Sequence, residues 1–140
     1  MDLGYAVAPF MAWLVSGSTK FAINSIRSGR LAFDLIGYGG LPSTHSAIVS
    51  SVAALVAIRE GLDHPAFGVA VALAFVVMLD ANSLRRQIGR QAQVINRLNE
   101  DAQEKPLRES MGHTRVQIGA GIVAGIVTAW AVDQFFSVIA

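Results

Sequence analysis

The run PAFGVAVALAFVVMLDA at residues 65–81 decides the fold class, because it carries no charged side chain before Asp80. The proline at its start suits a first helical turn, where the missing N–H would be unpaired in any case. Three other stretches of the chain are similarly apolar and have the length of helices. The four expected helices cover Leu3–Ile26, Ser43–Ile58, Pro65–Ala81 and Val116–Ile139.

The composition is that of a membrane protein. Of the 140 residues, 53% are hydrophobic and 15% are charged, and the mean hydropathy is +0.48. A soluble domain of this length would expose several apolar stretches, which a bilayer removes from water. The sequence therefore predicts one domain, residues 1–140, with an all-α fold: an integral membrane bundle of four transmembrane helices. Two of these are shorter than the roughly 20 residues that span a bilayer comfortably.

A polar insertion at about residues 82–112 separates the third and fourth expected helices. It predicts an aqueous helix that continues the third span, followed by a loop at Lys105-Pro106. If the helices alternate in direction, the insertion begins and ends at one face of the membrane, here termed the shared face. All 11 Lys and Arg residues except Arg59 lie at or beyond the shared face. The positive-inside rule therefore makes this face cytoplasmic.

Two compositional features exclude classes of function. The net charge of +1 gives no indication of a nucleic-acid partner. The absence of cysteine excludes disulfides, thiolate metal sites and a cysteine nucleophile.

Several polar side chains that are costly in membrane helices are expected at the shared face. Ionisable groups at membrane depth are functional candidates, because their desolvation must be offset by partners or water. Lys20 and Arg27 are seven residues apart, so both project from one face of the first helix. As an isolated pair they would simply reach lipid headgroups. The full set is Lys20, Arg27, Ser43, His45, Asp80, Arg85 and His113.

The segment GGLPSTHS at residues 39–46 indicates that these cations bind an anion rather than lipid headgroups. It places Gly39, Gly40, Ser43 and His45 at the start of the second expected helix. Free N–H groups and the helix dipole at such a start favour a bound phosphate. The segment therefore predicts an anion cradle beside an imidazole. A second imidazole, that of His113, reaches the same face at the start of the fourth helix.

Together these motifs resemble the type 2 phosphatidic acid phosphatase and vanadium haloperoxidase superfamily, and more closely its small divergent bacterial branch. In the family's first motif, a lysine is followed by six residues, an arginine and a proline. Lys20 and Arg27 match it, and Ser28 replaces the proline. The second motif, Pro-Ser-Gly-His, is similar to residues 42–45, Pro-Ser-Thr-His.

The third motif departs further from the family's pattern. The family has an arginine, a short gap, and a nucleophilic histidine with an aspartate four residues later. Here the polar insertion separates Arg85 from His113, and Gln117 stands at the position of the acid. The departure leaves open which group orients His113, and whether Arg85 or Arg86 binds phosphate.

The resemblance implies a phosphatase that uses neither a metal nor a cofactor. His113 would attack phosphorus to give a phosphohistidine, and His45 would protonate the leaving alcohol and then deprotonate water. Asp80 is the third catalytic candidate, and it would either orient a histidine or pair with Arg85 to join helix ends. The implied phosphate-binding residues are Lys20, Arg27, Ser43, Arg85, Gly39 and Gly40.

The expected substrate is a lipid phosphate, either an isoprenoid or a glycerophospholipid, that enters sideways from a bacterial inner membrane. The alternative is a noncatalytic membrane protein that binds anionic lipid or a partner through its basic loop. Four short helices form a thin wall around a buried site, which favours a homodimer. Gly121 and Gly125 let the fourth helix approach another closely, either in the same chain or in a partner.

Overall fold

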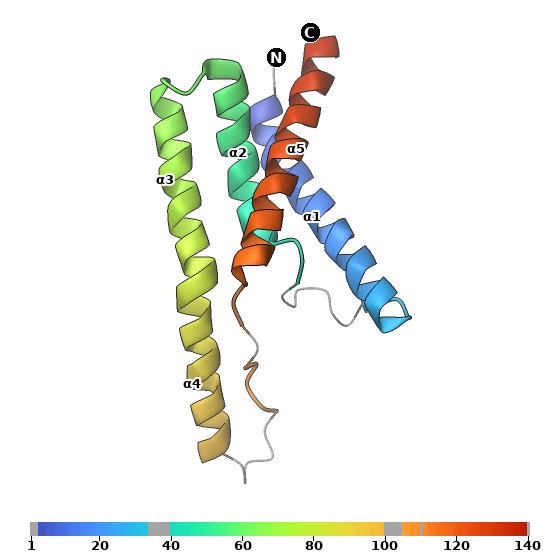
Figure 1. Cartoon of the computed structure of the whole chain (residues 1–140), viewed down its shortest axis with the longest axis vertical. Helices are drawn as coiled ribbons and strands as arrows, with labels where there is room; N and C mark the ends of the chain where they lie inside the picture. Colours follow the sequence, from blue (N-terminus) through green and yellow to red (C-terminus); the bar gives the residue numbers. More distant parts are fainter. Residues whose placement is uncertain (1–2, 34–39, 100–104, 110, 140) are drawn as a thin grey trace.

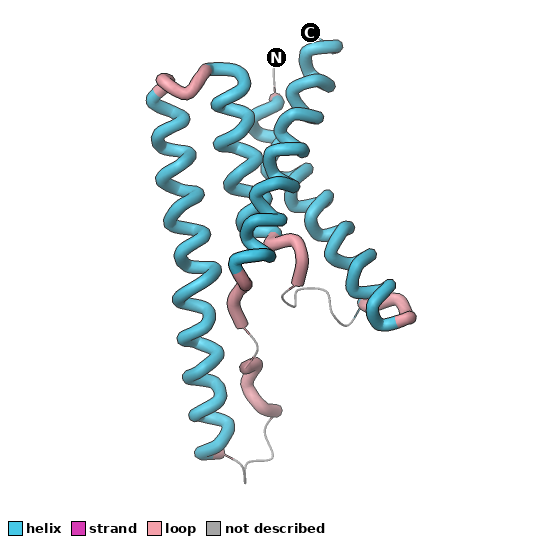
Figure 2. Tube along the Cα trace, in the orientation of Figure 1, coloured by secondary structure: helices cyan, strands magenta, loops and turns pink. Residues whose placement is uncertain are grey.

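The computed structural model describes residues 3–33, 40–99, 105–109 and 111–139, and the regular structure among them is helical (Figure 2). All four expected apolar helices are present, and the expected polar continuation of the third is α4. The elements are α1 (Gly4–Ser28), α2 (Thr44–Glu60), α3 (Pro65–Leu79), the π-helical turn η2 (Asp80–Leu84), α4 (Arg85–Leu98) and α5 (Arg115–Ile139).

Three helices within the described residues are long and apolar enough to cross a membrane: Gly4–Ser28, Pro65–Leu98 and Arg115–Val138. The second of these joins α3, η2 and α4 into one helix, which continues well past the start of α2 (Figure 1). With 17 residues, α2 is shorter than these spans. The described part of this membrane protein is therefore all-helical, with three long apolar spans and a shorter fourth apolar helix.

The short helix α2 packs against α1, α3 and α5 (Figure 1). Small side chains allow helix backbones to approach closely, and close packing takes the place of the hydrophobic effect between helices in lipid. Large apolar side chains elsewhere, such as Phe75 and Trp130, are exposed as expected for contact with lipid. The buried residues of α2 are mostly small: Ser46, Ala47, Val49, Ser50, Ser51, Leu55 and Val56.

The glycine pair of α5 packs against α2 of the same chain. A Cβ atom on Gly121 would lie 2.8 Å from the Cβ of Ser46, and one on Gly125 would lie 3.0 Å from the Cβ of Ser50. The same Cβ on Gly125 would lie 2.5 Å from the backbone carbonyl oxygen of Ala47, so backbone would have to move. The Gly-x-x-x-Gly spacing therefore serves the contact between α2 and α5.

Replacing Gly125 with alanine should destabilise this contact. We expect a loss of about 1–3 kcal/mol, because the added methyl group overpacks a helix interface that cannot move apart freely. Gly119→Ala is the matched control, since a Cβ there meets nothing within 4 Å. Thermal unfolding in detergent, followed by circular dichroism, measures both variants. Equal melting temperatures for the two variants would contradict the packing described for α2 and α5.

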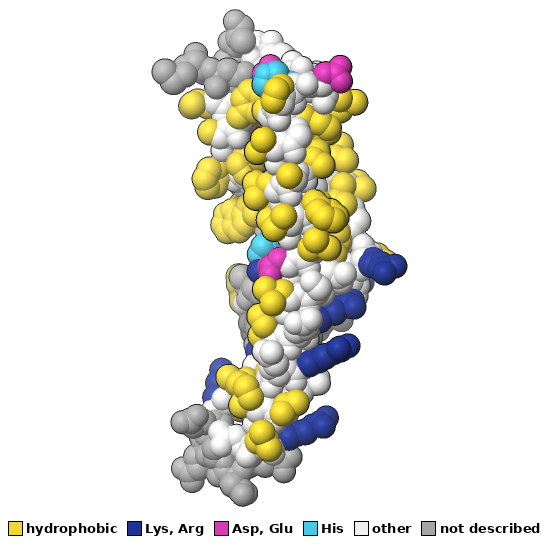
Figure 3. Space-filling view, turned by 90° about the vertical axis from the view of Figure 1, so that its left-hand side faces the viewer, with side chains coloured by type: hydrophobic (Ala, Val, Ile, Leu, Met, Phe, Trp, Pro, Cys, Tyr) yellow, Lys and Arg dark blue, Asp and Glu magenta, His cyan; other side chains and the backbone are white. Residues whose placement is uncertain are grey.

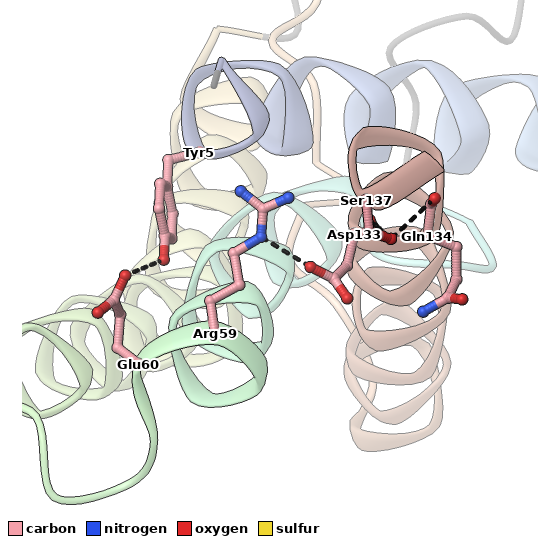
Figure 4. A network of polar contacts seen from close by, with 6 residues as sticks. All are labelled: Tyr5, Arg59, Glu60, Asp133, Gln134 and Ser137. Carbon is pink, nitrogen blue, oxygen red and sulfur yellow. Dashed lines mark hydrogen bonds and ion pairs between the residues drawn. The ribbon is translucent and has the colours of Figure 1, made fainter. Parts of the chain in front are cut away.

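A polar network joins three helices at the end of the bundle where both chain termini lie (Figure 4). Arg59 Nε of α2 donates to Asp133 Oδ1 of α5 over 2.7 Å, and the Tyr5 hydroxyl of α1 donates to Glu60 Oε1 over 2.6 Å. The Arg59 guanidinium carbon also lies 5.3 Å from the centre of the Tyr5 ring. These contacts fix the last turn of α2 at this end of the bundle. The first turn of α2 therefore lies toward the opposite end of the bundle.

Candidate active site

Three segments that are distant in the sequence meet around the start of α2. The backbone N–H of Ser43 donates to the Gln117 carbonyl on α5 over 2.9 Å. The backbone N–H of His113 donates to the Ala81 carbonyl in η2 over 3.0 Å. In η2 the N–H of Arg85 bonds to the Asp80 carbonyl five residues back. Wide π turns of this kind occur frequently at functional sites.

The return of the chain along α4 brings His113 to this position. The Asn96 carboxamide accepts from the Leu107 N–H over 2.8 Å, and donates to the Leu107 carbonyl over 2.9 Å and to Glu109 Oε1 over 2.8 Å. Gly89 leaves room for the Glu109 carbonyl, which a Cβ atom there would overlap. At Gly112 the backbone has φ +95°, a conformation that favours glycine. The long insertion thus folds back onto α4, which puts Arg85 and His113 at one site.

His45, Arg85 and Asp80 form a chain of contacts between α2 and η2. Nε2 of His45 lies 3.0 Å from Nη2 of Arg85. Since a guanidinium can only donate, the proton of this neutral imidazole lies on Nδ1. Asp80 Oδ2 lies 3.7 Å from Nε of Arg85, so the acid pairs with the arginine. Of the two roles expected for Asp80, this geometry matches the contact with Arg85.

His113 is buried beside His45, with 6% of its surface exposed. The two ring centres are 6.1 Å apart and the ring planes meet at 82°. Within the described part of the chain, neither ring nitrogen of His113 has a hydrogen-bond partner, and Nδ1 of His45 and Oδ1 of Asn82 also lack one. Buried polar groups are normally paired, so this group of free atoms indicates a place for a ligand.

The surroundings of His113 favour its neutral form. Burial is the largest cause that lowers the pKa of His113, and the neighbouring charge of Lys20 lowers it further. His45 and Arg85 act in the same direction, while the polar backbone of Gly112, which favours the charged ring, opposes them. A neutral imidazole has a free lone pair, so His113 is suited to act as a nucleophile.

Three of the other predicted phosphate ligands lie near the two histidines. Lys20 Nζ donates to Thr44 Oγ1 over 3.0 Å, and the stem of Lys20 passes beside Gly40, where a Cβ would lie 3.4 Å from its Cγ. Ser43 is fully buried as the N-cap of α2, and its Oγ accepts from the Ser46 hydroxyl over 3.0 Å. Ser43, Lys20 and Gly40 therefore lie at the site.

One predicted ligand, Arg27, is not brought to this group. The side chain of Arg27 is exposed near the end of α1, which leans away from α2 and α5 (Figure 1). Among the described residues, no contact joins Arg27 to Ser43 or to either histidine. Gly39 lies outside the described residues.

Sequence reasoning gave no structural role to Asn82 or Thr114, and it noted Gln117 only as the residue at the position of the family's acid. The last two form a reciprocal pair at the start of α5, and their Thr-x-x-Gln spacing before an apolar run is a recognisable capping signature. No signal in the sequence marked Asn82, because its burial depends on the turn η2.

Comparison with known proteins identifies the family of this chain. Residues 4–128 match the family model described as the Divergent PAP2 family. The uncharacterized membrane protein YuiD of Bacillus subtilis (strain 168) is 33% identical over 135 residues, which cover 84% of this chain and 85% of the relative. No solved structure matches the chain. The family match covers most of the chain, including every motif that carried the resemblance, and the protein therefore belongs to the Divergent PAP2 family.

Proposed function

We propose that the protein is a metal-independent lipid phosphate phosphatase, which hydrolyses an isoprenoid or glycerophospholipid phosphate through a phosphohistidine on His113. The observation that carries the proposal is the burial of His113 beside His45, with both of its ring nitrogens unpaired among the residues that the structure describes. Lys20 and Arg85 surround this pair with positive charge. Phosphoryl transfer depends mainly on positioning and on such charge around the phosphate oxygens.

The reaction has two displacements at phosphorus. In the first, the neutral His113 ring attacks, the ester P–O bond breaks, and protonated His45 gives its proton to the leaving lipid alcohol. In the second, neutral His45 takes a proton from water, which attacks the phosphohistidine. The P–N bond then breaks, which releases inorganic phosphate and restores His113.

Arg85 changes partner during this cycle. In the substrate-free site its guanidinium donates to Nε2 of His45, so that nitrogen is occupied. A bound phosphate is a stronger acceptor than a neutral imidazole, because its hydrogen bond to the arginine is charge-assisted on both sides. Arg85 therefore moves to the phosphate and leaves Nε2 of His45 free. His45 takes up a proton there from solvent as the substrate binds and returns one to solvent when phosphate leaves, so the cycle begins and ends with a neutral His45. Asp80 limits the movement through its contact with Nε of Arg85.

Substrate reaches the site from the side, within the membrane. The 17 residues of α2 extend about 26 Å, slightly less than the bilayer hydrocarbon thickness of about 30 Å. With its last turn fixed among the network of Arg59, α2 forms the fourth membrane segment and sets Ser43 close to the opposite boundary. That boundary is the cytoplasmic side of a bacterial inner membrane, because ten of the 11 Lys and Arg residues lie at or beyond it.

A noncatalytic role in binding anionic lipid is the second candidate, and a row of cations on α4 favours it. Arg86, Arg90 and Arg97 are all exposed, and Figure 3 shows positive side chains aligned along this part of the molecule. Such a row attracts acidic headgroups. It does not account for the buried ring of His113, whose two nitrogens have no hydrogen-bond partner among the described residues, beside His45.

The test of the proposal is phosphate release by detergent-purified protein from a panel of lipid phosphates, in the presence of EDTA. We expect release from at least one isoprenoid or glycerophospholipid phosphate, and much slower release from the matching water-soluble headgroup. Vanadate should inhibit, because it mimics the pentacoordinate state of phosphorus. Binding of anionic lipid without release from any substrate would favour the noncatalytic role.

The pH dependence of kcat/KM should follow the fraction of His113 that is neutral. Since the pKa of His113 is lowered from 6.5, the ring stays neutral below that pH, and the acid limb of the profile should lie below pH 6.5. Lys20→Met removes a charge that lowers this pKa, so its acid limb should move to higher pH. The same substrate is used for both enzymes, so its own titration cancels. An acid limb unchanged by Lys20→Met would contradict this reading of the site.

A further inference from the structure

The position of His113 is fixed by its backbone, and Gln117 is central to this arrangement. Gln117 lies in the first turn of α5, four residues after His113. In the described residues neither ring nitrogen of His113 has a hydrogen-bond partner, so no side chain there orients the ring. The direction of the ring must therefore follow from the segment that carries it.

The side chain of Gln117 closes a capping box with Thr114. Gln117 Oε1 accepts from the Thr114 N–H over 2.9 Å, and Thr114 Oγ1 accepts from the Gln117 N–H over 3.2 Å. This pair satisfies two N–H groups at the start of the helix. The residue next to His113 is thereby fixed to the first turn of α5.

The main chain of Gln117 connects the two halves of the site. Its carbonyl accepts from the Ser43 N–H over 2.9 Å, at the turn that leads into His45. On the other side, the His113 N–H donates to the Ala81 carbonyl in η2. One residue thus contacts the segment of the nucleophile through its side chain and the segment of the acid–base histidine through its backbone.

We propose that Gln117 is a positioning residue, which sets the separation of His113 from Ser43 and His45 without touching the substrate. The inference rests on the proposed phosphatase function for its kinetic consequences. The proposal also explains how His113 is held without the aspartate that the family has at position 117. The chain fixes the backbone on both sides of His113 instead of binding its ring.

An uncharged amide suits this position better than the carboxylate that a capping box equally accepts. A glutamate at residue 117 would cap the helix but would place negative charge near the phosphate site. That charge would repel an anionic substrate and oppose the effect of Lys20 on His113. Glutamine supplies the same acceptor without the charge.

The experiment compares Gln117→Leu with Thr114→Val, which each remove one half of the capping box. Both should lower kcat about 10- to 100-fold with little change in KM, because misplacing a reacting group slows chemistry more than binding. The double variant should be no worse than either single one. Thr114→Ser keeps the hydroxyl and should restore kcat. His64→Ala is the control, since it removes the cap of α3, where His64 Nδ1 accepts from the Ala66 N–H over 3.2 Å.

A second measurement is independent of turnover. Ring titration of His113 by NMR on histidine-labelled protein should show its pKa rising toward 6.5 in Gln117→Leu and Thr114→Val, since both loosen its burial and its placement beside Lys20 and His45. His64→Ala should leave the curve unchanged. If the wild type releases no phosphate but the titrations behave in this way, the phosphatase proposal fails and the positioning role stands. Normal kcat and titration in Thr114→Val, with losses only in Gln117→Leu, would overturn the positioning role.

Discussion

His113→Ala should reduce phosphate release by about 10⁴-fold or more, because it removes the nucleophile and no other described side chain can take its place. Binding of the lipid substrate should persist, since the cations of Lys20 and Arg85 remain. Initial rates under saturating substrate measure the first effect, and a fluorescent lipid phosphate measures the second. His64→Ala is the matched control, because this third histidine is exposed in the turn between α2 and α3.

The outcome of this comparison separates three accounts. Loss of turnover with intact binding supports the histidine mechanism. Loss of both would mean that the alanine disturbs the fold, and His113→Gln, which keeps a polar side chain of similar size, would then be measured. Turnover within tenfold of the wild type in both His113 variants would contradict the mechanism.

Arg85→Gln should lower kcat/KM about 10³-fold, whereas Arg86→Gln should change it by no more than about threefold. Arg85 is partly buried and reaches His45, while the neighbouring Arg86 is exposed. Glutamine keeps the stem of either side chain, including the Arg86 Cγ that packs beside Gly112. The pair therefore tests which of two adjacent arginines binds phosphate, with the same loss of charge in both variants. Equal effects in the two variants would mean that both arginines contribute only a diffuse positive potential, and that neither binds the phosphate directly.

The sequence was sufficient to predict the helices and most of the residues that converge, for physical reasons that particular residues illustrate. A run as apolar as residues 65–79 has no stable place outside lipid, and alternation of direction then assigns each helix end to one face. This reasoning placed seven polar residues at one face, and the structure brings all of them except Arg27 to one site: Lys20, Ser43, His45, Asp80, Arg85 and His113. Their contacts with one another, such as that of Arg85 with His45, needed the structure.

Other features depend on packing that periodicity does not encode. The turn η2 arises within a continuous helix, so the pattern of apolar residues around Asp80 does not reveal it. Whether Gly121 and Gly125 met a helix of the same chain depended on how α2 and α5 cross. The exposure of Arg27 depends on the lean of α1, although Lys20 and Arg27 share a helix face in the sequence. The return of the insertion along α4 rests on Asn96, whose role no local motif predicts.

The most direct test of the account is to trap the covalent intermediate. Protein mixed with a lipid phosphate carrying labelled phosphorus is quenched in alkali, where a phosphohistidine is stable, and is then digested and mapped by mass spectrometry. We predict label on the peptide that contains His113, its loss on brief acid treatment, and its absence from His113→Ala. Steady turnover with no label on His113, or label on another residue, would contradict the central claim.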